Sequence, residues 1–173
     1  MSGADVMVPA EEDLVYRFKQ AMRRFPSGVT VVTAHPPGPP QAITVSAFCS
    51  VSLEPPLVLV CLNRNGRAAT AIANSPAFAV NFLSEEQTDD SRACTSPVEN
   101  RLAEVAWRPG SNGAPILVRA TAALECRRHA LFPAGDHVIL VGEVTNTHLH
   151  EPTRPLAYHD GGYCRVSPHV LAG

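Results

Sequence analysis

Apolar and polar residues alternate along residues 43–53, the segment ITVSAFCSVSL. Every odd-numbered position is apolar, whereas four of the five even-numbered positions carry a hydroxyl group, namely Thr44, Ser46, Ser50 and Ser52. This period of two predicts one extended strand with a buried face. The other face has no charged residue, and hydroxyl groups both donate and accept hydrogen bonds. That face is therefore predicted either to contact a polar ligand or to lie beneath a loop.

The chain that follows predicts a strand, a basic turn and a helix. Two prolines at 55–56 end the first strand, because proline cannot donate a hydrogen bond to a central ladder. The apolar run at 57–62 predicts a strand buried on both faces. The turn NRNGR at 63–67 precedes a helix at 68–73. Arginine and the free N–H groups of a helix N-terminus suit an anion, although basic turns are also common on protein surfaces.

The remaining pattern predicts a mainly β protein, an antiparallel β-barrel with peripheral helices. Further strands are predicted at 29–34, 78–83, 116–127, 137–150 and 155–166, with loops at 35–40 and 107–115 and a turn at 160–162. Helical segments are predicted at 11–24, from apolar spacing, and in parts of 84–103, from a capping pattern at Ser84 and Gln87. Strands and helices do not alternate, which disfavours a doubly wound parallel sheet.

Composition narrows the class of protein. The chain has 173 residues, of which 45% are apolar and 17% charged, so we expect one domain at 13–173 after a flexible lead-in at 1–12. The net charge of −2 without a basic block gives little support to nucleic-acid binding. No apolar run approaches the roughly 20 residues of a membrane helix, and the N-terminus does not resemble a signal peptide. The five scattered cysteines predict reduced thiols in a cytoplasmic protein.

Several familiar catalytic motifs are missing from the sequence. It contains no G-x-G-x-x-G, no G-x-x-x-x-G-K-[ST] and no G-x-S-x-G. His148 and His150 share one strand face, but spacing fixes no third ligand, so no metal site is predicted. The triplet Gly135-Asp136-His137 opens a long apolar strand and is either a plain turn or part of a site.

Five segments in order resemble one known family. They are PSGVTVVTA (26–34), ITVSAFCSVSLEPPLVLVCLNR (43–64), FAVNFLSEEQ (78–87), GDHVILVGEV (135–144) and PLAYHDGGY (155–163). Together they resemble the short-chain flavin reductases, the reductase components of two-component flavin-dependent monooxygenases. The resemblance spans residues 16–166 and implies an FMN-binding split barrel that forms a homodimer.

The resemblance also implies an activity. It is hydride transfer from NADH or NADPH to FMN or FAD, followed by delivery of free reduced flavin to a partner monooxygenase. NADH is preferred, because no basic cluster offers itself for a 2′-phosphate. The flavin supplies the chemistry and the protein supplies binding and orientation, so no catalytic side chain is expected.

The resemblance assigns candidate residues to each ligand. Flavin contacts are expected from Thr44, Val45, Ser46, Ala47, Ser50, Ser52, Cys61, Leu62, Asn63, Asn65, Arg67 and Phe82. NADH contacts are expected from His137, Tyr158 and His159. Many relatives carry Ser or Thr in the phosphate loop, where this chain has Asn65, Gly66 and Ala68, and this difference leaves FMN versus FAD open.

Two other functions remain open at this point. One is a flavin-binding split-barrel protein without turnover, serving as a carrier or sensor. The other is a split-barrel oxidase of a small amine or phosphate ester. Loss of the NADH absorbance band in the presence of catalytic flavin distinguishes the reductase from both.

Overall fold

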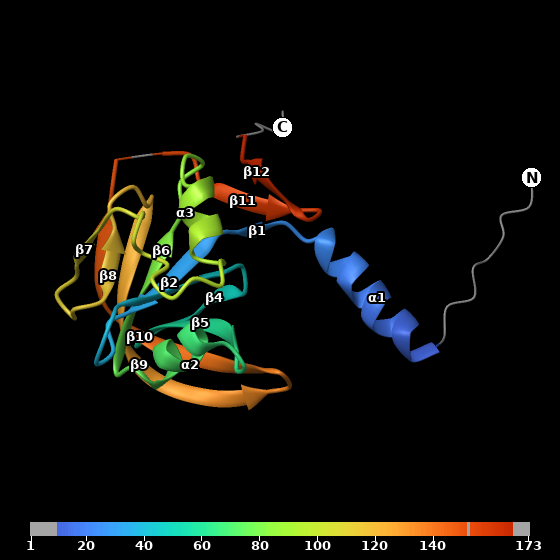
Figure 1. Cartoon of the computed structure of the whole chain (residues 1–173), viewed down its shortest axis with the longest axis horizontal. Helices are drawn as coiled ribbons and strands as arrows, with labels where there is room; N and C mark the ends of the chain where they lie inside the picture. Colours follow the sequence, from blue (N-terminus) through green and yellow to red (C-terminus); the bar gives the residue numbers. More distant parts are fainter. Residues whose placement is uncertain (1–9, 152, 168–173) are drawn as a thin grey trace, which may run out of the picture.

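The structure, a computed structural model, describes residues 10–151 and 153–167 (Figure 1). Most of the predicted lead-in, residues 1–9, lies outside the described residues. Residues 10–12 belong to helix α1 (Ala10–Arg23), so the predicted helix at 11–24 is confirmed.

Seven antiparallel strands form the main sheet in the order β3-β2-β6-β9-β10-β5-β4. Their bounds are β2 (Thr30–Ala34), β3 (Gln41–Val45), β4 (Phe48–Leu53), β5 (Pro56–Asn63), β6 (Ala77–Phe82), β9 (Ala122–Ala134) and β10 (His137–Leu149). The two edge strands, β3 and β4, are joined by Ser46 and Ala47 alone. This connection spans at most about 11 Å, so the sheet must curl until its edges approach each other. The predicted antiparallel barrel is therefore confirmed.

The prediction of one strand over 43–53 is wrong. Residues 41–45 pair with β2 and residues 48–53 pair with β5, so the chain crosses from one edge of the sheet to the other at Ser46 and Ala47. The N–H of Cys61 donates to the carbonyl of Ala47 at 3.0 Å and fixes the crossing. Alternation continues through the crossing, so the period of two cannot reveal where one strand ends.

The smaller elements lie around the barrel. They are β1 (Ser27–Gly28), β11 (Leu156–His159) and β12 (Gly162–Arg165) in one sheet, the hairpin of β7 (Trp107–Pro109) and β8 (Pro115–Leu117), and helices α2 (Arg67–Asn74) and α3 (Thr88–Ala93). The predicted loop at 107–115 thus contains a strand, and the predicted strand at 116–127 is divided between β8 and β9. Of the predicted helical stretch at 84–103, only α3 forms an α-helix. Gln87 Oε1 does accept from the Ser84 N–H at 3.1 Å, yet the helix begins after this pair.

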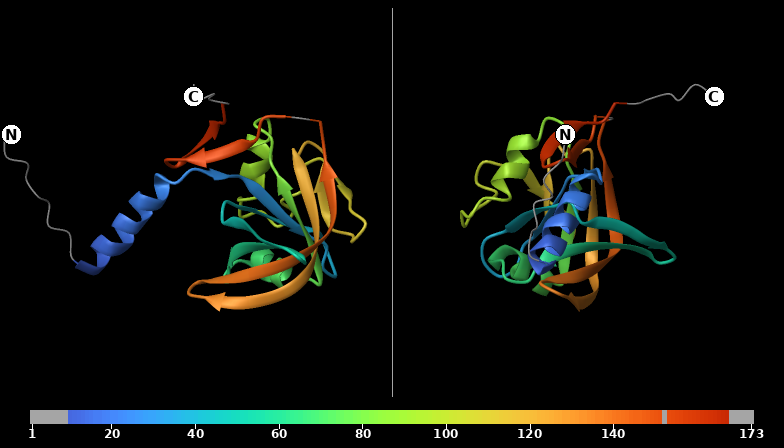
Figure 2. Two further views of the ribbon diagram at one scale, coloured as in Figure 1. Left: turned by 180° about the vertical axis from the view of Figure 1, so that it is seen from behind. Right: turned by 90° about the vertical axis from the view of Figure 1, so that its right-hand side faces the viewer.

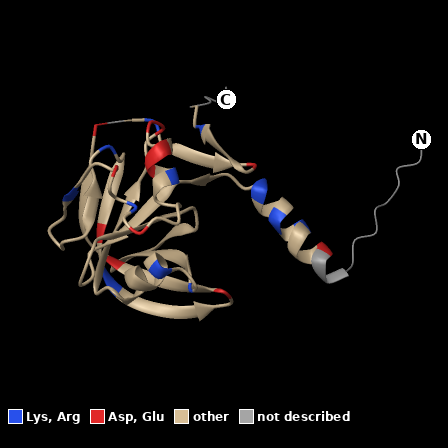
Figure 3. Cartoon of the chain, in the orientation of Figure 1, with Lys and Arg blue, Asp and Glu red and all other residues tan. Residues whose placement is uncertain are grey.

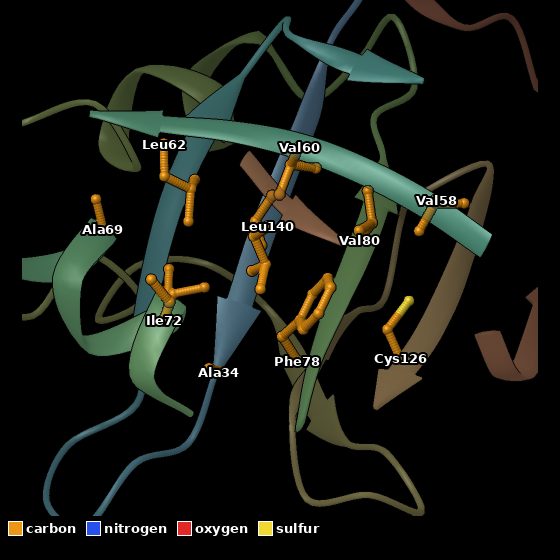
Figure 4. Close-up of a cluster of buried hydrophobic side chains, with 12 residues drawn as sticks. Ala34, Val58, Val60, Leu62, Ala69, Ile72, Phe78, Val80, Cys126 and Leu140 are labelled. Carbon is orange, nitrogen blue, oxygen red and sulfur yellow. The ribbon is translucent and has the colours of Figure 1, made fainter. Parts of the chain in front are cut away.

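The core of the barrel is apolar and is closed at one side by α2 (Figure 4). Val58, Val60 and Leu62 of β5 point into it and are buried. Leu59 and Cys61, on the opposite face of β5, are only half-buried. The prediction that this strand is buried on both faces is therefore wrong, and its second apolar face remains available to another molecule.

Helix α1 stands away from the barrel (Figures 1 and 2). Its apolar residues Leu14, Phe18 and Met22 are 70%, 62% and 48% exposed. Charged and uncharged residues are interspersed along the helix (Figure 3). Its C-terminal end is held by Arg23, which donates to the carboxylate of Asp160 at 3.2 Å and to its carbonyl at 3.0 Å. An apolar stripe of this kind is expected to be covered by other residues. In the single chain it is exposed to solvent.

Candidate functional site

A cavity of about 820 Å³, called cavity 1, lies between α1, the β4–β5 hairpin and β11. Five of the predicted site residues line it: Ser46, Ala47, Cys61, Tyr158 and His159. They come from two segments more than 90 residues apart in the sequence, and from both the flavin and the NADH sets. The fold therefore brings the two predicted ligand sites to one place.

His137 lies at the end of the same sheet face. It is directly opposite Asn63 in the β5–β10 ladder, and opposed residues share a face. Cys61, two residues before Asn63, shares that face and lines cavity 1. The structure thus places His137 beside the flavin-side turn, at a different part of the site from Tyr158 and His159.

The turn that carries His137 packs against the basic turn. The Arg64 N–H donates to the carbonyl of Asp136 at 3.1 Å. Gly135 has a φ of +62°, which glycine adopts without strain, so the triplet is a tight turn as well as a site candidate. Asp136 Oδ1 lies 2.7 Å from His137 Nδ1, and this hydrogen bond lowers the pKa of the Asp136 carboxyl.

The basic turn is organised by Asn63. Its side-chain oxygen accepts from the Asn65 N–H at 2.9 Å, and its carbonyl accepts from the Gly66 N–H at 3.3 Å. Gly66 is the N-cap of α2 and makes no side-chain capping bond, so the first N–H groups of the helix remain available to a ligand. Arg67 begins the helix and lines cavity 2, of about 300 Å³, together with Arg101. This arrangement suits a phosphate group.

Cavity 3, of about 510 Å³, adjoins cavity 1 at Ser46 and Tyr158. Thr44 also lines it and donates to the carbonyl of Ser91 at 2.7 Å. Two further residues line this cavity, Arg92 and Tyr163, and neither was among the expected site residues. Tyr163 falls within a segment of the family resemblance, whereas nothing in the apolar pattern of α3 singles out Arg92.

Three predicted flavin residues contact the core instead of lining a cavity. Leu62 is fully buried in the core, which leaves only its backbone for the predicted flavin contact, and that contact stays a prediction. Val45 packs against the same core. Phe82 also packs there and meets the ring of Phe48 edge-on at 5.1 Å between centroids. Because Phe48 lines cavity 1, Phe82 acts on that cavity through Phe48.

The hydroxyl groups of β4 lie apart from the three cavities. Neither Ser50 nor Ser52 lines any of them. The oxygen of Ser52 accepts from the Glu54 N–H at 3.2 Å and so supports the β4–β5 turn. Of the hydroxyl-bearing residues in 43–53, Thr44 and Ser46 therefore line a cavity, whereas Ser50 and Ser52 belong to the β4–β5 hairpin.

Within residues 10–151 and 153–167, no group of three or more His, Cys, Asp or Glu side chains lies close enough together to hold a metal ion. His148 Nε2 is 2.7 Å from the carboxylate of Glu125, and His150 is bonded to the carbonyl of Ala120. None of the described helices is long and apolar enough to cross a bilayer.

A sequence model described as a flavin reductase like domain matches residues 22–167. The chain belongs to this flavin reductase family. Among its relatives, the reductase component of the FADH(2)-dependent resorcinol hydroxylase of Rhizobium sp. (strain MTP-10005) is 40% identical over 94% of this chain and 93% of the relative. The stachydrine N-demethylase reductase subunit Stc3 of Rhizobium meliloti is 42% identical over 89% of this chain, which spans 66% of that protein's length.

Solved structures show the same fold. The NADH:FAD oxidoreductase SgcE6 of Streptomyces globisporus, solved with NAD and FAD fragments, superposes with a TM-score of 0.85 at 32% identity, covering 95% of this chain and 98% of that one. The chain is therefore a flavin reductase, an oxidoreductase that uses NADH to reduce FMN or FAD. The expected split-barrel fold, enzyme class and cofactors are confirmed. Relatives named as the reductase component of a hydroxylase and the reductase subunit of a flavin-dependent monooxygenase support delivery of reduced flavin to a monooxygenase.

Proposed function

We propose that this flavin reductase brings the flavin ring and the nicotinamide ring together in cavity 1 and releases reduced flavin to a partner monooxygenase. The observation that carries the proposal is the shared sheet face, which joins cavity 1 to Asn63 and His137. Hydride transfer needs two rings held roughly 3–3.5 Å apart and no side-chain acid. A cavity with an apolar wall and a few hydroxyl groups meets that need.

The residues present fit a flavin with a phosphate. In the proposal, Ser46 and the backbone at Ala47 contact the ring, and Cys61 contributes to the apolar wall. Asn65, Arg67 and the uncapped N–H groups of α2 bind the phosphate. These donors take the place of the hydroxyl groups that many relatives carry in this loop.

The direct test of the proposed function is turnover. We expect the purified protein to oxidise NADH only when FMN or FAD is added, since the protein contributes positioning and the flavin accepts the hydride. The measurement is the decrease of NADH absorbance with and without flavin. Tight flavin binding without NADH oxidation would instead support the carrier or sensor.

His137→Ala is expected to raise the KM for NADH more than the KM for flavin. The proposal places the imidazole against the nicotinamide nucleotide, so its loss affects that substrate's binding. Steady-state kinetics with each substrate varied in turn provide the measurement, and a parallel series with NADPH determines the preference. Equal changes in both KM values would remove His137 from the NADH site.

We further propose that the chain is a homodimer in which α1 packs against a second copy. Leu14, Phe18, Met22 and Phe25 recur at helical spacing and are all exposed, which is unusual for a chain that acts alone. The apolar wall of cavity 1, formed in part by Leu59, also faces outward. In a two-fold dimer each copy offers the same surface to the other. One contact would therefore cover both the apolar stripe of α1 and the apolar wall of cavity 1.

Phe18→Glu is expected to convert the dimer to a monomer at micromolar concentration. A charge on the apolar stripe would have to be buried without a partner in the dimer. Light scattering after size-exclusion chromatography measures the mass. The control is Arg17→Gln on the same helix, whose pair with Asp13 is solvent-exposed and contributes little. A wild-type chain that is monomeric throughout would contradict the proposal.

A single domain at 13–173 and a cytoplasmic location complete the proposal. The five cysteines are all free, as expected for a reducing compartment. Cell fractionation with an antibody against the chain tests the location.

A further inference from the structure

Arg92 is the only charged residue among the described residues that line cavity 3. Its side chain is 67% exposed and contacts the carboxylate of Asp89 at 3.2 Å. Because Asp89 is itself 94% exposed, this ion pair contributes little free energy. The guanidinium is therefore available to an anionic ligand.

The position of Arg92 is set by a fixed aromatic ring. The guanidinium carbon lies 5.7 Å from the centroid of the Tyr163 ring, within range of a cation–π interaction. The Tyr163 hydroxyl is 2.8 Å from the hydroxyl of buried Ser91, and its ring meets Tyr158 edge-on at 5.7 Å. The backbone carbonyl of Ser91 in turn accepts a hydrogen bond from the Thr44 hydroxyl. A network of contacts thus holds the cation at the cavity wall.

Cavity 3 has the size and the connection that a dinucleotide requires. Its volume of about 510 Å³ lies within the range of about 300–1,000 Å³ that is typical of small-molecule sites. It shares Ser46, Tyr158 and Gly161 with cavity 1. A ligand whose redox ring lies in cavity 1 can therefore extend past Tyr158 to Arg92. Thr95, also in the lining, offers a hydroxyl donor.

We infer that cavity 3 binds the adenosine diphosphate group of a dinucleotide, with Arg92 paired to the diphosphate. A planar guanidinium matches phosphate oxygens in a bidentate manner. Only the placement of the redox ring in cavity 1 rests on the proposed function. Both NADH and FAD carry this group. A flavin phosphate at Arg67, in a separate cavity, makes NADH the better match for cavity 3.

Binding of ADP alone tests the subsite without catalysis. Isothermal titration of the full-length protein with ADP should show binding to the wild type and about ten- to a hundredfold weaker binding to Arg92→Gln, the effect of one charge-assisted hydrogen bond. Arg127→Gln is the matched control. The side chain of Arg127 is exposed to a similar extent, and this residue on β9 pairs with Glu143 on β10. No binding of ADP to the wild type, or equal binding to Arg92→Gln, overturns the inference.

Kinetic comparisons identify which dinucleotide uses the subsite. Arg92→Gln should raise the KM for NADH about ten- to a hundredfold and leave that for reduced nicotinamide mononucleotide unchanged. If Arg92→Gln weakens binding of FAD but not of FMN, the subsite belongs to the flavin dinucleotide. Equal effects on each dinucleotide and its mononucleotide overturn the inference. A protein that binds ADP through Arg92 but never oxidises NADH would refute the proposed function and keep the subsite.

Discussion

Replacing Arg67 with alanine is expected to weaken FMN binding about ten- to a hundredfold while leaving riboflavin binding nearly unchanged. The guanidinium lies at the start of α2, beside N–H groups that no side chain caps. Its nearest carboxylate is Glu99 at 3.9 Å, in an exposed pair that competes weakly with a phosphate. A charge-assisted hydrogen bond contributes about 1.5–3 kcal/mol, which corresponds to that loss of affinity. Riboflavin has no phosphate and provides the internal comparison.

Titration of flavin fluorescence with wild type, Arg67→Ala and Arg127→Ala gives the measurement. Arg127 lies on β9 and has no proposed contact with flavin, so its variant should bind both flavins as the wild type does. Parallel losses for FMN and riboflavin in Arg67→Ala would show that Arg67 supports the turn without touching the phosphate. An unchanged affinity for FMN would place the phosphate elsewhere.

The second large effect is expected for Glu125→Gln, which removes a buried carboxylate. Glu125 is fully buried on β9 and accepts hydrogen bonds from the Ser111 hydroxyl at 2.8 Å, the Asn112 N–H at 2.8 Å and Asn146 at 3.1 Å. His148 Nε2 lies 2.7 Å away. These bonds hold the β7–β8 loop against the barrel.

Glutamine replaces one acceptor oxygen by a donor group, which then faces other donors. Since hydrogen bonds to charged groups contribute about 1.5–3 kcal/mol each, we expect the free energy of unfolding to fall by about 2–4 kcal/mol. Denaturant unfolding at a fixed protein concentration measures the loss. Glu143→Gln is the control, because Glu143 forms an ion pair with exposed Arg127 that contributes about 0.2–1 kcal/mol. Similar losses in both variants would contradict the role of the buried network.

The same network predicts how stability depends on pH. Burial alone would raise the pKa of Glu125, but hydrogen bonds from His148, Ser111 and Asn112 outweigh it and lower the pKa from 4.5 to about 2. A carboxyl whose pKa is lower in the folded state stabilises the protein above its unfolded pKa. That contribution, about 3 kcal/mol, is lost as the pH falls from 4.5 towards 2. The difference in stability between wild type and Glu125→Gln should therefore narrow over this range, and a constant difference would contradict the assignment.

The His148 tautomer follows from its two neighbours. Its Nδ1 faces a guanidinium nitrogen of Arg108 at 3.2 Å, and a guanidinium can only donate. Nδ1 therefore accepts, and the proton on Nε2 donates to Glu125. The two contacts tie Arg108, His148 and Glu125 into one cluster, which acts as a structural anchor. The sequence had raised His148 only as an incomplete metal ligand.

Much of the secondary structure was predictable because it depends on local pattern. The helix α1, the turn at Gly135, the long strand β10 and the hairpin of β11 and β12 all lie close to their predicted positions. Each has a clear apolar period or a glycine-containing turn within a few residues. The division of 43–53 into β3 and β4 was missed because strand pairing depends on distant partners that local alternation does not report.

The candidate site was predictable in part. Ordered segments of family resemblance identified Ser46, Cys61, Tyr158 and His159, which the fold brings to cavity 1. The burial of Leu62 and the position of Arg92 at a cavity were not predictable. Which face of a strand is covered, and which helix residue borders a cavity, depends on how the elements pack.

The sequence by itself determined the family, the β-rich architecture and the candidate residues for each ligand. Residue period and short motifs carry that information, because they reflect which side of an element is apolar. Only the tertiary structure decided what covers each side. It showed that β5 is buried on one face alone, that α1 exposes its apolar stripe, and that Arg92 borders a cavity next to Tyr158. These features arise from contacts between segments far apart in the chain, and no local pattern encodes them.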